Sequence, residues 1–262
     1  MELILEQGVF GYGQTAEPAF CLGPVDLCLR PGELTVILGP NGSGKSTLLG
    51  LLSGRLKLRG GRLELRTAEG PRMPLPSGPK RSEIMGLLPQ TGGRHFDYTV
   101  EEMAGMGAYA RRGLLSPESP AEKARRREVL ERLGLGELKN RGVLSLSGGE
   151  YQKVLLSRLL IQDPLIFLLD EPANHLDLEH QLFIFSLVKE ECQKGRAAAA
   201  VLHDINLALS YADKLLALDR GKPVYQGPPE AAALREVLEK LYHLPLAEYT
   251  GPGGRRLLWP FL

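Results

Sequence analysis

Residues 39–46 carry the first pattern that could perform chemistry. They read Gly-Pro-Asn-Gly-Ser-Gly-Lys-Ser, which satisfies the spacing G-x-x-x-x-G-K-[ST]. The backbone N–H groups of such a glycine-rich turn can point at phosphate oxygens, the lysine adds a positive charge, and the serine hydroxyl can ligate Mg²⁺. The competing interpretation is a glycine-rich turn beside a surface lysine. An apolar strand at 34–38 and a helix at 46–53 flank the pattern and favour a phosphate loop.

We therefore predict that this segment binds ATP together with Mg²⁺. Lys45 is predicted to assist catalysis through its charge, and Ser46 to be a metal ligand. The residues predicted to contact the nucleotide in this segment are Gly39, Asn41, Gly42, Ser43, Gly44, Lys45, Ser46 and Thr47.

Asp170 and Glu171 form a second feature that could perform chemistry. They follow the apolar residues 165–169, and open α/β sheets place their ligands at the carboxyl ends of strands. Asp170 is suited to hold Mg²⁺, and Glu171 is suited to polarise the water that attacks the γ-phosphate. Alone, such a pair is more often a turn or a helix cap. Its position after a phosphate loop in the same predicted sheet favours the catalytic interpretation.

The elements that must position these residues predict an α/β fold. Strands with a buried pattern alternate with helical stretches and are predicted at residues 34–38, 84–88, 165–169, 197–202 and 215–218. This alternation implies a parallel sheet that is covered on both faces. The chain is predicted to form one domain over residues 1–262.

Two further regions are predicted to accompany the parallel sheet. Short strands at 3–5 and 27–29, separated by a loop at 11–18, predict an antiparallel β lobe. An α-helical subdomain, inserted in the core at about 95–160, is predicted from helices at 100–110, 121–133 and 149–160. The segment 67–79 contains four prolines and is predicted to be an exposed loop without regular pairing.

Composition excludes several classes of protein. The 262 residues carry 32 Lys and Arg against 31 Asp and Glu, so the net charge of +1 predicts no nucleic-acid partner. The basic run at 125–127 is predicted to be a solvated helix face. Three cysteines without a Cys-x-x-Cys pair argue against a disulfide framework or a zinc ribbon and favour a reducing cytoplasm. Because no apolar run approaches roughly 18 residues, we expect a soluble chain whose membrane contact is made through a partner.

The segment 146–150, Leu-Ser-Gly-Gly-Glu, resembles the signature segment of the ABC ATPase family. It precedes the acid pair as it does in that family, and the resemblance covers nearly the whole chain. The resemblance implies a P-loop NTPase core and a head-to-tail pair of subunits that encloses two ATP molecules. In that pair, Ser147, Gly148 and Gly149 would meet the γ-phosphate bound by the other subunit. Their place at a helix start, with free N–H groups, suits an anion.

Four other positions match the family individually. Tyr12 resembles the aromatic residue that stacks on adenine, with Phe10 as the alternative. Gln90 resembles the glutamine that joins the Mg²⁺ and water network and takes part in catalysis. Asp177 resembles the residue that contacts the opposite subunit. His203 resembles the histidine that positions the attacking water.

Within the family, segments 170–181 and 203–208 look most like the ATPases of importers for iron-siderophore complexes, haem and cobalamin. This resemblance implies a separate integral membrane permease, an extracytoplasmic substrate-binding protein and a place at the cytoplasmic face of the membrane. The face around Gln90 and residues 100–112 would meet the permease. Two alternatives remain open, namely a soluble ABC ATPase without a transport role and the ATPase of an exporter. Glu150, Tyr151 and the stretch 108–111 depart from the common family pattern.

Overall fold

A computed structural model gives the structure of the chain and describes residues 1–13, 20–67, 70–90, 96–109, 117–174, 176–230, 232–251 and 256–261. The chain divides into two compact units. The first unit contains Met1–Leu75, Leu169–Glu171 and Phe185–Leu262, and the second contains Pro76–Leu168 and Pro172–Ile184. The α/β fold class predicted from the sequence is confirmed.

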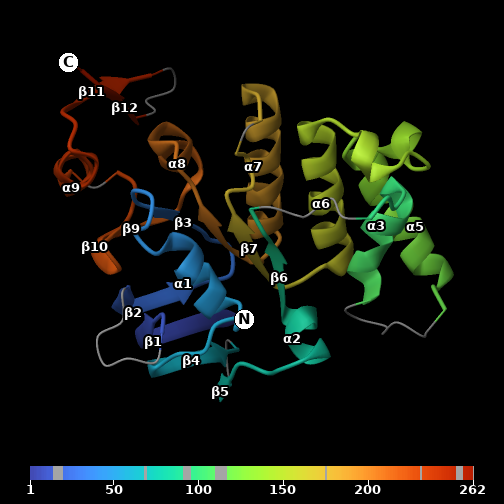
Figure 1. Cartoon of the computed structure of the whole chain (residues 1–262), viewed down its shortest axis with the longest axis horizontal. Helices are drawn as coiled ribbons and strands as arrows, with labels where there is room; N and C mark the ends of the chain where they lie inside the picture. The colour runs from blue at the N-terminus through green and yellow to red at the C-terminus, as the bar shows by residue number, and fades with distance from the viewer. Residues whose placement is uncertain are drawn as a thin grey trace. The chain divides into compact units, whose positions relative to one another are not determined.

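An antiparallel sheet forms one layer of the first unit (Figure 1). Its strand order is β2-β1-β4-β5, with bounds β1 (Glu2–Gly11), β2 (Cys21–Leu29), β4 (Gly60–Arg66) and β5 (Arg72–Pro74). Leu3, Ile4 and Leu5 of β1 are all buried, so both faces of the strand are covered here. The antiparallel lobe predicted from short apolar strands is therefore present, with longer strands than the apolar residues alone indicated. Residues 14–19 of the predicted connecting loop lie outside the described part of the chain.

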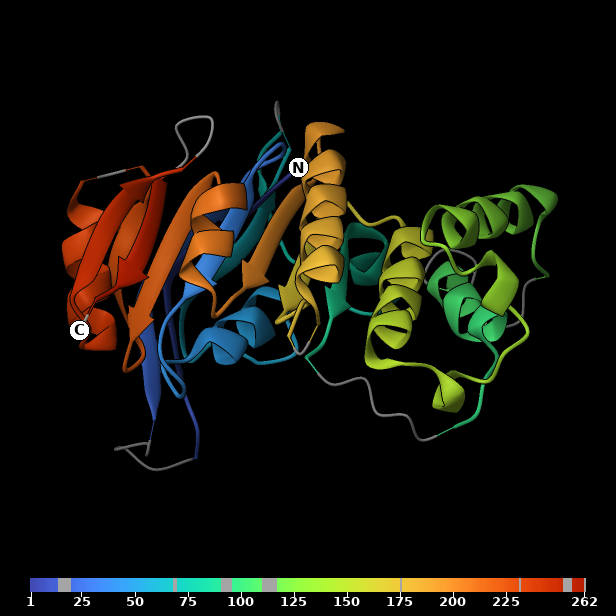
Figure 2. The same cartoon turned by 90° about the horizontal axis from the view of Figure 1, so that it is seen from above.

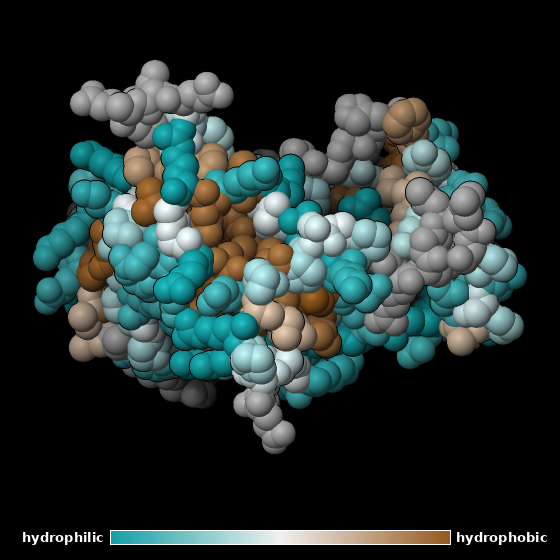
Figure 3. All heavy atoms as spheres, turned by 90° about the horizontal axis from the view of Figure 1, so that it is seen from below, coloured by the Kyte–Doolittle hydropathy of each residue, from teal (hydrophilic) through white to brown (hydrophobic). Residues whose placement is uncertain are grey.

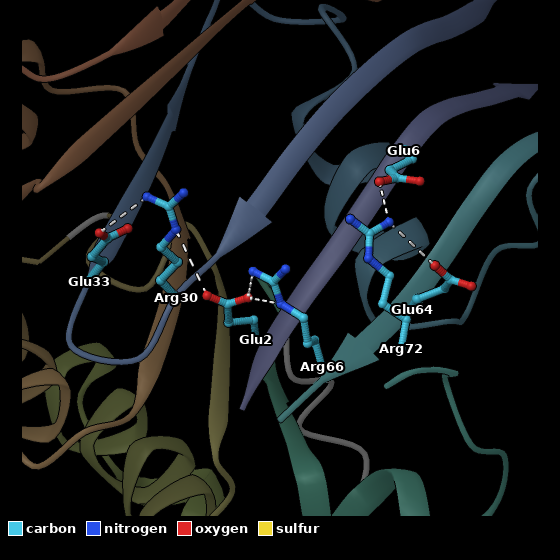
Figure 4. Close-up of polar contacts among 7 residues, drawn as sticks. All are labelled: Glu2, Glu6, Arg30, Glu33, Glu64, Arg66 and Arg72. Atoms are coloured by element: carbon cyan, nitrogen blue, oxygen red, sulfur yellow. Dashed lines mark hydrogen bonds and ion pairs between the residues drawn. The ribbon is translucent and has the colours of Figure 1, made fainter. Parts of the chain in front are cut away.

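The prediction that segment 67–79 lacks regular pairing is wrong for residues 72–74. Met73 of β5 pairs with Leu65 of β4 in antiparallel register. Charged side chains of neighbouring strands account for this pairing of an otherwise exposed strand (Figure 4). Arg72 lies between one glutamate of β1 and one of β4. Glu2 likewise contacts Arg66 at 2.5 Å, and Arg30 at 4.0 Å.

A second sheet, which is mostly parallel, contains the most deeply buried strands. In the first unit, the parallel strands β9, β3 and β8 lie in that order, with the exposed β10 antiparallel to β9 at the edge and the end of β7 next to β8. In the second unit, the beginning of β7 lies next to β6. All residues of β3 and β8 are buried, because helices and sheet cover both faces of these strands. The bounds are β3 (Leu34–Leu38), β6 (Met85–Leu88), β7 (Ile166–Asp170), β8 (Ala197–Val201), β9 (Lys214–Asp219) and β10 (Lys222–Gly227).

The helices of the first unit follow its strands directly. Helix α1 (Lys45–Leu52) follows β3, and α8 (Ile205–Tyr211) follows β8. Helix α7 (Leu178–Gln193) starts in the second unit and ends in the first. The chain then adds α9 (Ala233–Tyr242) and the hairpin of β11 (Leu246–Thr250) and β12 (Arg256–Pro260), which the sequence did not predict.

The second unit is mostly helical (Figure 2). Helix α6 (Gly148–Gln162) packs against α3 (Val100–Gly105) and α5 (Pro120–Arg132). Helix α2 (Pro79–Ile84) precedes β6, so the strand predicted from residue 84 begins one residue later. The helix predicted at 100–110 ends as an α-helix at Gly105 and continues as a 3₁₀ turn over Met106–Ala108.

Arginines 125–127 are not the uniformly solvated helix face that the sequence predicted. The Arg126 side chain is 17% exposed and pairs with Glu101 at 3.0 Å and with Glu118 at 2.5 Å. Arg125 pairs with Asp163 at 2.8 Å, whereas Arg127 is exposed. The run therefore joins α5 to neighbouring segments of the second unit, a role that depends on residues distant in the sequence.

The three cysteines are free thiols. Among the described residues, no helix combines the length and the apolar character needed to cross a bilayer. Figure 3 shows one face of the molecule, on which hydrophilic residues predominate and hydrophobic ones gather in a smaller central area.

Candidate functional site

The predicted phosphate loop connects buried β3 to α1 in the first unit. Two of its glycines are required by the path of the backbone. Gly39 has φ 151°, and a Cβ there would lie 2.4 Å from the Leu218 carbonyl oxygen. Gly44 has φ 104° and is the N-cap of α1, where a Cβ would meet the Phe20 ring at 2.8 Å. The loop therefore needs glycine to place its backbone N–H groups at the start of a helix, where phosphate binds.

Lys45 lies at the centre of this loop. Its ammonium group donates to the carbonyl oxygens of Gly39 at 2.7 Å and Pro40 at 3.0 Å. Burial lowers the pKa of Lys45, and the nearby Glu171 and Asp170 oppose that shift. Carbonyl oxygens only partly compensate a buried ammonium charge, so a phosphate anion would be a better partner.

The buried hydroxyl of Ser43 gives a second indication of a phosphate ligand. Within the described part of the chain, its Oγ is buried and has no hydrogen-bond partner. Buried polar atoms normally have such partners, so an orphaned hydroxyl inside a glycine-rich loop fits a bound phosphate oxygen. Asn41 and Gly42 of the same loop are exposed, whereas Thr47 is buried.

Ser46 and Asp170 come together from residues 124 apart in the sequence. The Ser46 hydroxyl donates to Asp170 Oδ1 at 3.1 Å. Burial raises the pKa of Asp170, Ser46 opposes the shift and Glu171 adds to it. Because burial disfavours the carboxylate, a bound cation would stabilise it. Oxygen ligands of this kind are the ones Mg²⁺ prefers, and the two residues therefore fit the predicted metal.

Glu171 and His203 form the pair predicted to act on water. Glu171 Oε1 lies 2.6 Å from His203 Nε2, and the two side chains are 9% and 43% exposed. The distance places the imidazole and the carboxylate within hydrogen-bond reach of each other. Glu171 has φ 50°, a left-handed conformation that non-glycine residues adopt mainly at turns and functional sites. The turn after β7 thus directs the glutamate toward the histidine.

Tyr12 and Phe10 differ in exposure. Tyr12 is 51% exposed, whereas Phe10 is 9% exposed and lies edge-on to Tyr12, with ring centroids 4.9 Å apart. The Tyr12 hydroxyl is 3.3 Å from Thr47 Oγ1, next to the phosphate loop. Only Tyr12 offers an open ring face for stacking, so the geometry favours it over Phe10.

The signature segment starts α6 in the second unit. Ser147 is the N-cap: its hydroxyl accepts from the Glu150 N–H at 3.2 Å, and the Glu150 carboxylate accepts from the Ser147 N–H at 2.8 Å. These bonds lower the pKa of Glu150. Glu150, at which the sequence departs from the common family pattern, thus has a clear structural role. Gly148 is exposed, and a Cβ there would meet nothing within 4 Å.

Asp177 is held by a histidine that the sequence analysis missed. Its Oδ1 is 2.6 Å from His180 Nδ1 and accepts from the His180 N–H at 2.9 Å, and these contacts lower the pKa of Asp177. The His180 ring in turn lies beside Gly149, 3.4 Å from an added Cβ. The Asp-x-x-His spacing at the start of a helix was the available signal. His175, in the family segment that precedes Asp177, lies outside the described residues.

The structure therefore brings together the predicted residues of the first unit, namely Tyr12, Gly39, Ser43, Lys45, Ser46, Thr47, Asp170, Glu171 and His203. Gln90, Ser147, Gly148, Gly149 and Asp177 belong to the second unit. Gln90 is exposed and follows β6 by two residues. The functional roles of all these residues, in both units, stay predictions.

The sequence and the structure of the chain are similar to those of known proteins of one family. The family model "ABC transporter" matches residues 22–174. The hemin import ATP-binding protein HmuV of Pseudomonas fluorescens (strain Pf0-1) is 37% identical over 242 residues, which cover 88% of this chain and 90% of the relative. HmuV of Myxococcus xanthus (strain DK1622) is 37% identical over 240 residues, covering 89% and 88%. A solved metal-chelate type ABC transporter in an inward-facing conformation has a TM-score of 0.83 and 27% identity, covering 99% and 97%.

The match spans more than half of the chain and includes the phosphate loop, the signature segment and the acid pair. Subunits of this kind bind ATP and work as dimers with separate permease components. The chain belongs to the ABC transporter family, as an ATP-binding subunit that hydrolyses ATP to power transport.

Proposed function

We propose that the chain energises the import of a haem-type metal chelate. Two relatives with 37% identity are hemin import ATP-binding proteins, and the structural neighbour with the TM-score of 0.83 is a metal-chelate type transporter. In this proposal, two copies act at the cytoplasmic face of the membrane beneath a permease, and a substrate-binding protein delivers the chelate from outside. The chain's own residues supply ATP hydrolysis, and the chelate is bound by the other subunits.

The observation that carries the chemistry is the 2.6 Å contact between Glu171 and His203 beside the phosphate loop. Glu171 accepts a proton from the attacking water, and the oxygen of that water forms a bond to the γ-phosphorus while the bond to the β,γ-bridging oxygen breaks. His203 holds the Glu171 carboxylate in orientation. Lys45 and the loop amides stabilise the negative charge on the phosphates. Ser46 and Asp170 would hold Mg²⁺, which when bound neutralises phosphate charge.

The substitution E171Q tests the general-base assignment. We expect kcat for ATP hydrolysis to fall at least about 100-fold, because the amide no longer accepts the proton. The Kd for ATP should stay within about threefold, since Lys45 and the loop are unchanged. E33Q, at a half-buried glutamate of the same unit outside the phosphate loop, serves as the control. Undiminished steady-state turnover of E171Q would refute the assignment.

Dimerisation around ATP can be tested at Gly148. A Cβ at this position meets nothing within 4 Å, so both G148A and G148D are expected to fold. If the start of α6 meets a γ-phosphate of the other copy, the charge added by G148D will prevent ATP-dependent dimerisation of the E171Q protein, and G148A will not. Analytical ultracentrifugation with and without ATP measures this. Equal dimerisation of the two variants would contradict the proposed role of the signature segment.

A groove of about 480 Å³ in the second unit is suited to the permease. Tyr98 and Tyr109, 37% and 38% exposed, line it together with Glu101 and Glu102. Arg126 also lines the groove and already pairs with Glu101, so the exposed rings are what favours a partner helix with apolar residues. We expect the tagged chain to co-purify with a polytopic membrane protein from native membranes, and Y98A/Y109A to lose it. Recovery of soluble partners alone would favour the non-transport alternative.

A further inference from the structure

The side-chain amide of Asn206 joins α8 to the C-terminal hairpin. Its Nδ2 donates to the Leu258 carbonyl oxygen at 3.0 Å, and its Oδ1 accepts from the Leu258 N–H at 2.9 Å. The contact thus uses both halves of the amide and both backbone groups of one β12 residue. Helix α8 and β12 belong to the same unit, and they lie side by side in Figures 1 and 2. Because the N–H and the carbonyl oxygen of Leu258 are both hydrogen-bonded to Asn206, this part of β12 is held against α8.

Helix α8 begins directly after His203. Asp204 is its N-cap and accepts from the Leu207 N–H at 2.9 Å. Asn206 lies in the first turn of α8, and His203 lies just outside the helix, next to its N-cap Asp204. Any shift of α8 relative to β12 is therefore transmitted to the histidine that contacts Glu171.

The C-terminal segment is itself anchored in the first unit. Leu258 and Leu246 of the hairpin are 1% and 2% exposed, and Leu234 and Leu238 of α9 are fully buried. At the end of α9, the hydroxyl oxygen of Tyr242 is buried beside the backbone of Gly39. Burial raises the pKa of Tyr242, and the Gly39 backbone opposes this shift. The segment thus reaches both the start of the phosphate loop and the helix that follows His203.

We propose that α9, β11 and β12 brace the ATPase site and that Asn206 is a positioning residue for His203. The inference rests on the roles proposed above for Glu171 and His203. The buried hairpin holds α8 through the Asn206 amide, and α8 holds the imidazole against the Glu171 carboxylate. Asn206 itself touches neither ATP nor the attacking water.

The first test is N206L, which has nearly the same shape and removes both hydrogen bonds. We expect kcat for ATP hydrolysis to fall about 10- to 100-fold, because a small displacement of a catalytic group has effects of this size. The KM for ATP should change less than about threefold, since the phosphate loop is unaltered. The control S210A removes a hydrogen bond from the Ser210 hydroxyl to the Asn206 carbonyl within α8, without involving β12, and should keep the wild-type kcat.

The second test, N206D, asks whether kcat follows the hydrogen bonds between residue 206 and Leu258 as pH changes. Deprotonated, the introduced carboxylate only accepts and repels the Leu258 carbonyl, whereas the protonated acid again offers one donor and one acceptor. The kcat of N206D divided by that of the wild type should therefore rise as pH falls. The ratio removes the titration of shared groups near this contact, namely His203, Asp204, Glu248 opposite Leu258 and its partner Arg256. A ratio independent of pH would overturn the proposal.

A double-mutant cycle separates this inference from the proposed function. If Asn206 acts through His203, N206L will lower kcat in the wild type but cause no further loss in H203A. Equal losses in both backgrounds, or no loss in the wild type, would overturn the positioning role. An unchanged kcat in H203A would instead refute the role proposed for His203 itself.

Discussion

Gly39 offers a direct test of how the phosphate loop is shaped. Both Gly39 and Gly42 have positive φ, 151° and 78°, so alanine at either position adopts a disfavoured conformation. They differ in their surroundings. A Cβ at Gly39 would lie 2.4 Å from the Leu218 carbonyl oxygen of β9 and 2.5 Å from Ser43 Oγ, whereas a Cβ at Gly42 would meet nothing within 4 Å. G42A is thus the matched control for G39A.

The expected loss of stability has two contributions, namely the positive φ and the clash of the added Cβ. The left-handed conformation destabilises either variant by about 1–2 kcal/mol. The clash with a strand backbone adds about 1–3 kcal/mol for G39A alone. We therefore expect G39A to lose about 2–5 kcal/mol and G42A about 1–2 kcal/mol. At about 2–4 °C per kcal/mol for a chain of this size, the two thermal midpoints should differ by several degrees.

Scanning calorimetry provides the measurement. The transition to follow is the one whose midpoint rises when ATP is added, because ligand binding stabilises the unit that contains the loop. G39A should also weaken ATP binding more than G42A does, since its loop must move away from Leu218. Equal midpoints for the two variants would refute the argument that the Leu218 carbonyl dictates the path of the loop.

Three other predictions concern cysteine reactivity, pH and helix packing. Burial raises the pKa of Cys192 to about 12, so iodoacetamide at pH 8 should label exposed Cys21 in the folded protein and spare Cys192. Mass spectrometry measures the labelling, and equal labelling of the two cysteines would contradict the prediction. Ser147 lowers the pKa of Glu150, so the carboxylate stabilises the fold above the ordinary carboxyl pKa and loses this effect as pH falls through the lowered value. The urea midpoints of the wild type and of E150Q should therefore converge in acid. A constant difference between the two midpoints would contradict this prediction. R126L should reduce the free energy of unfolding by about 1–3 kcal/mol, whereas R127L, at an exposed arginine, should reduce it by less than about 0.5 kcal/mol. Denaturant titrations measure both values, and similar losses in the two variants would argue against the packing role of Arg126.

Short segments of the sequence determined much of the fold and part of the site. The phosphate loop was predictable because its spacing, the strand before it and the helix after it lie within about twenty residues. The Asp170-Glu171 pair was predictable for the same reason, because it ends a buried apolar strand. The start of α6 at Gly148, directly after Ser147, follows from a local capping box.

Tertiary structure decided the features that join distant residues. Asn206 and Leu258 are 52 residues apart, and no local pattern indicates that an asparagine on one helix will pair with a later strand. The arginine run at 125–127 was misread because its acidic partners come from other segments. Exposure favoured Tyr12, the residue predicted from the sequence, over its alternative Phe10.

One physical cause separates the features that the sequence predicted from those that it did not. Turns, caps and strand patterns depend on backbone conformation over a few residues, so their chemistry is written in adjacent side chains. The pairs Ser46 with Asp170 and Glu171 with His203 form only when strands distant in the sequence align in one sheet. Sequence alone therefore determined which groups could bind and hydrolyse ATP, and the packed sheet decided which of them meet.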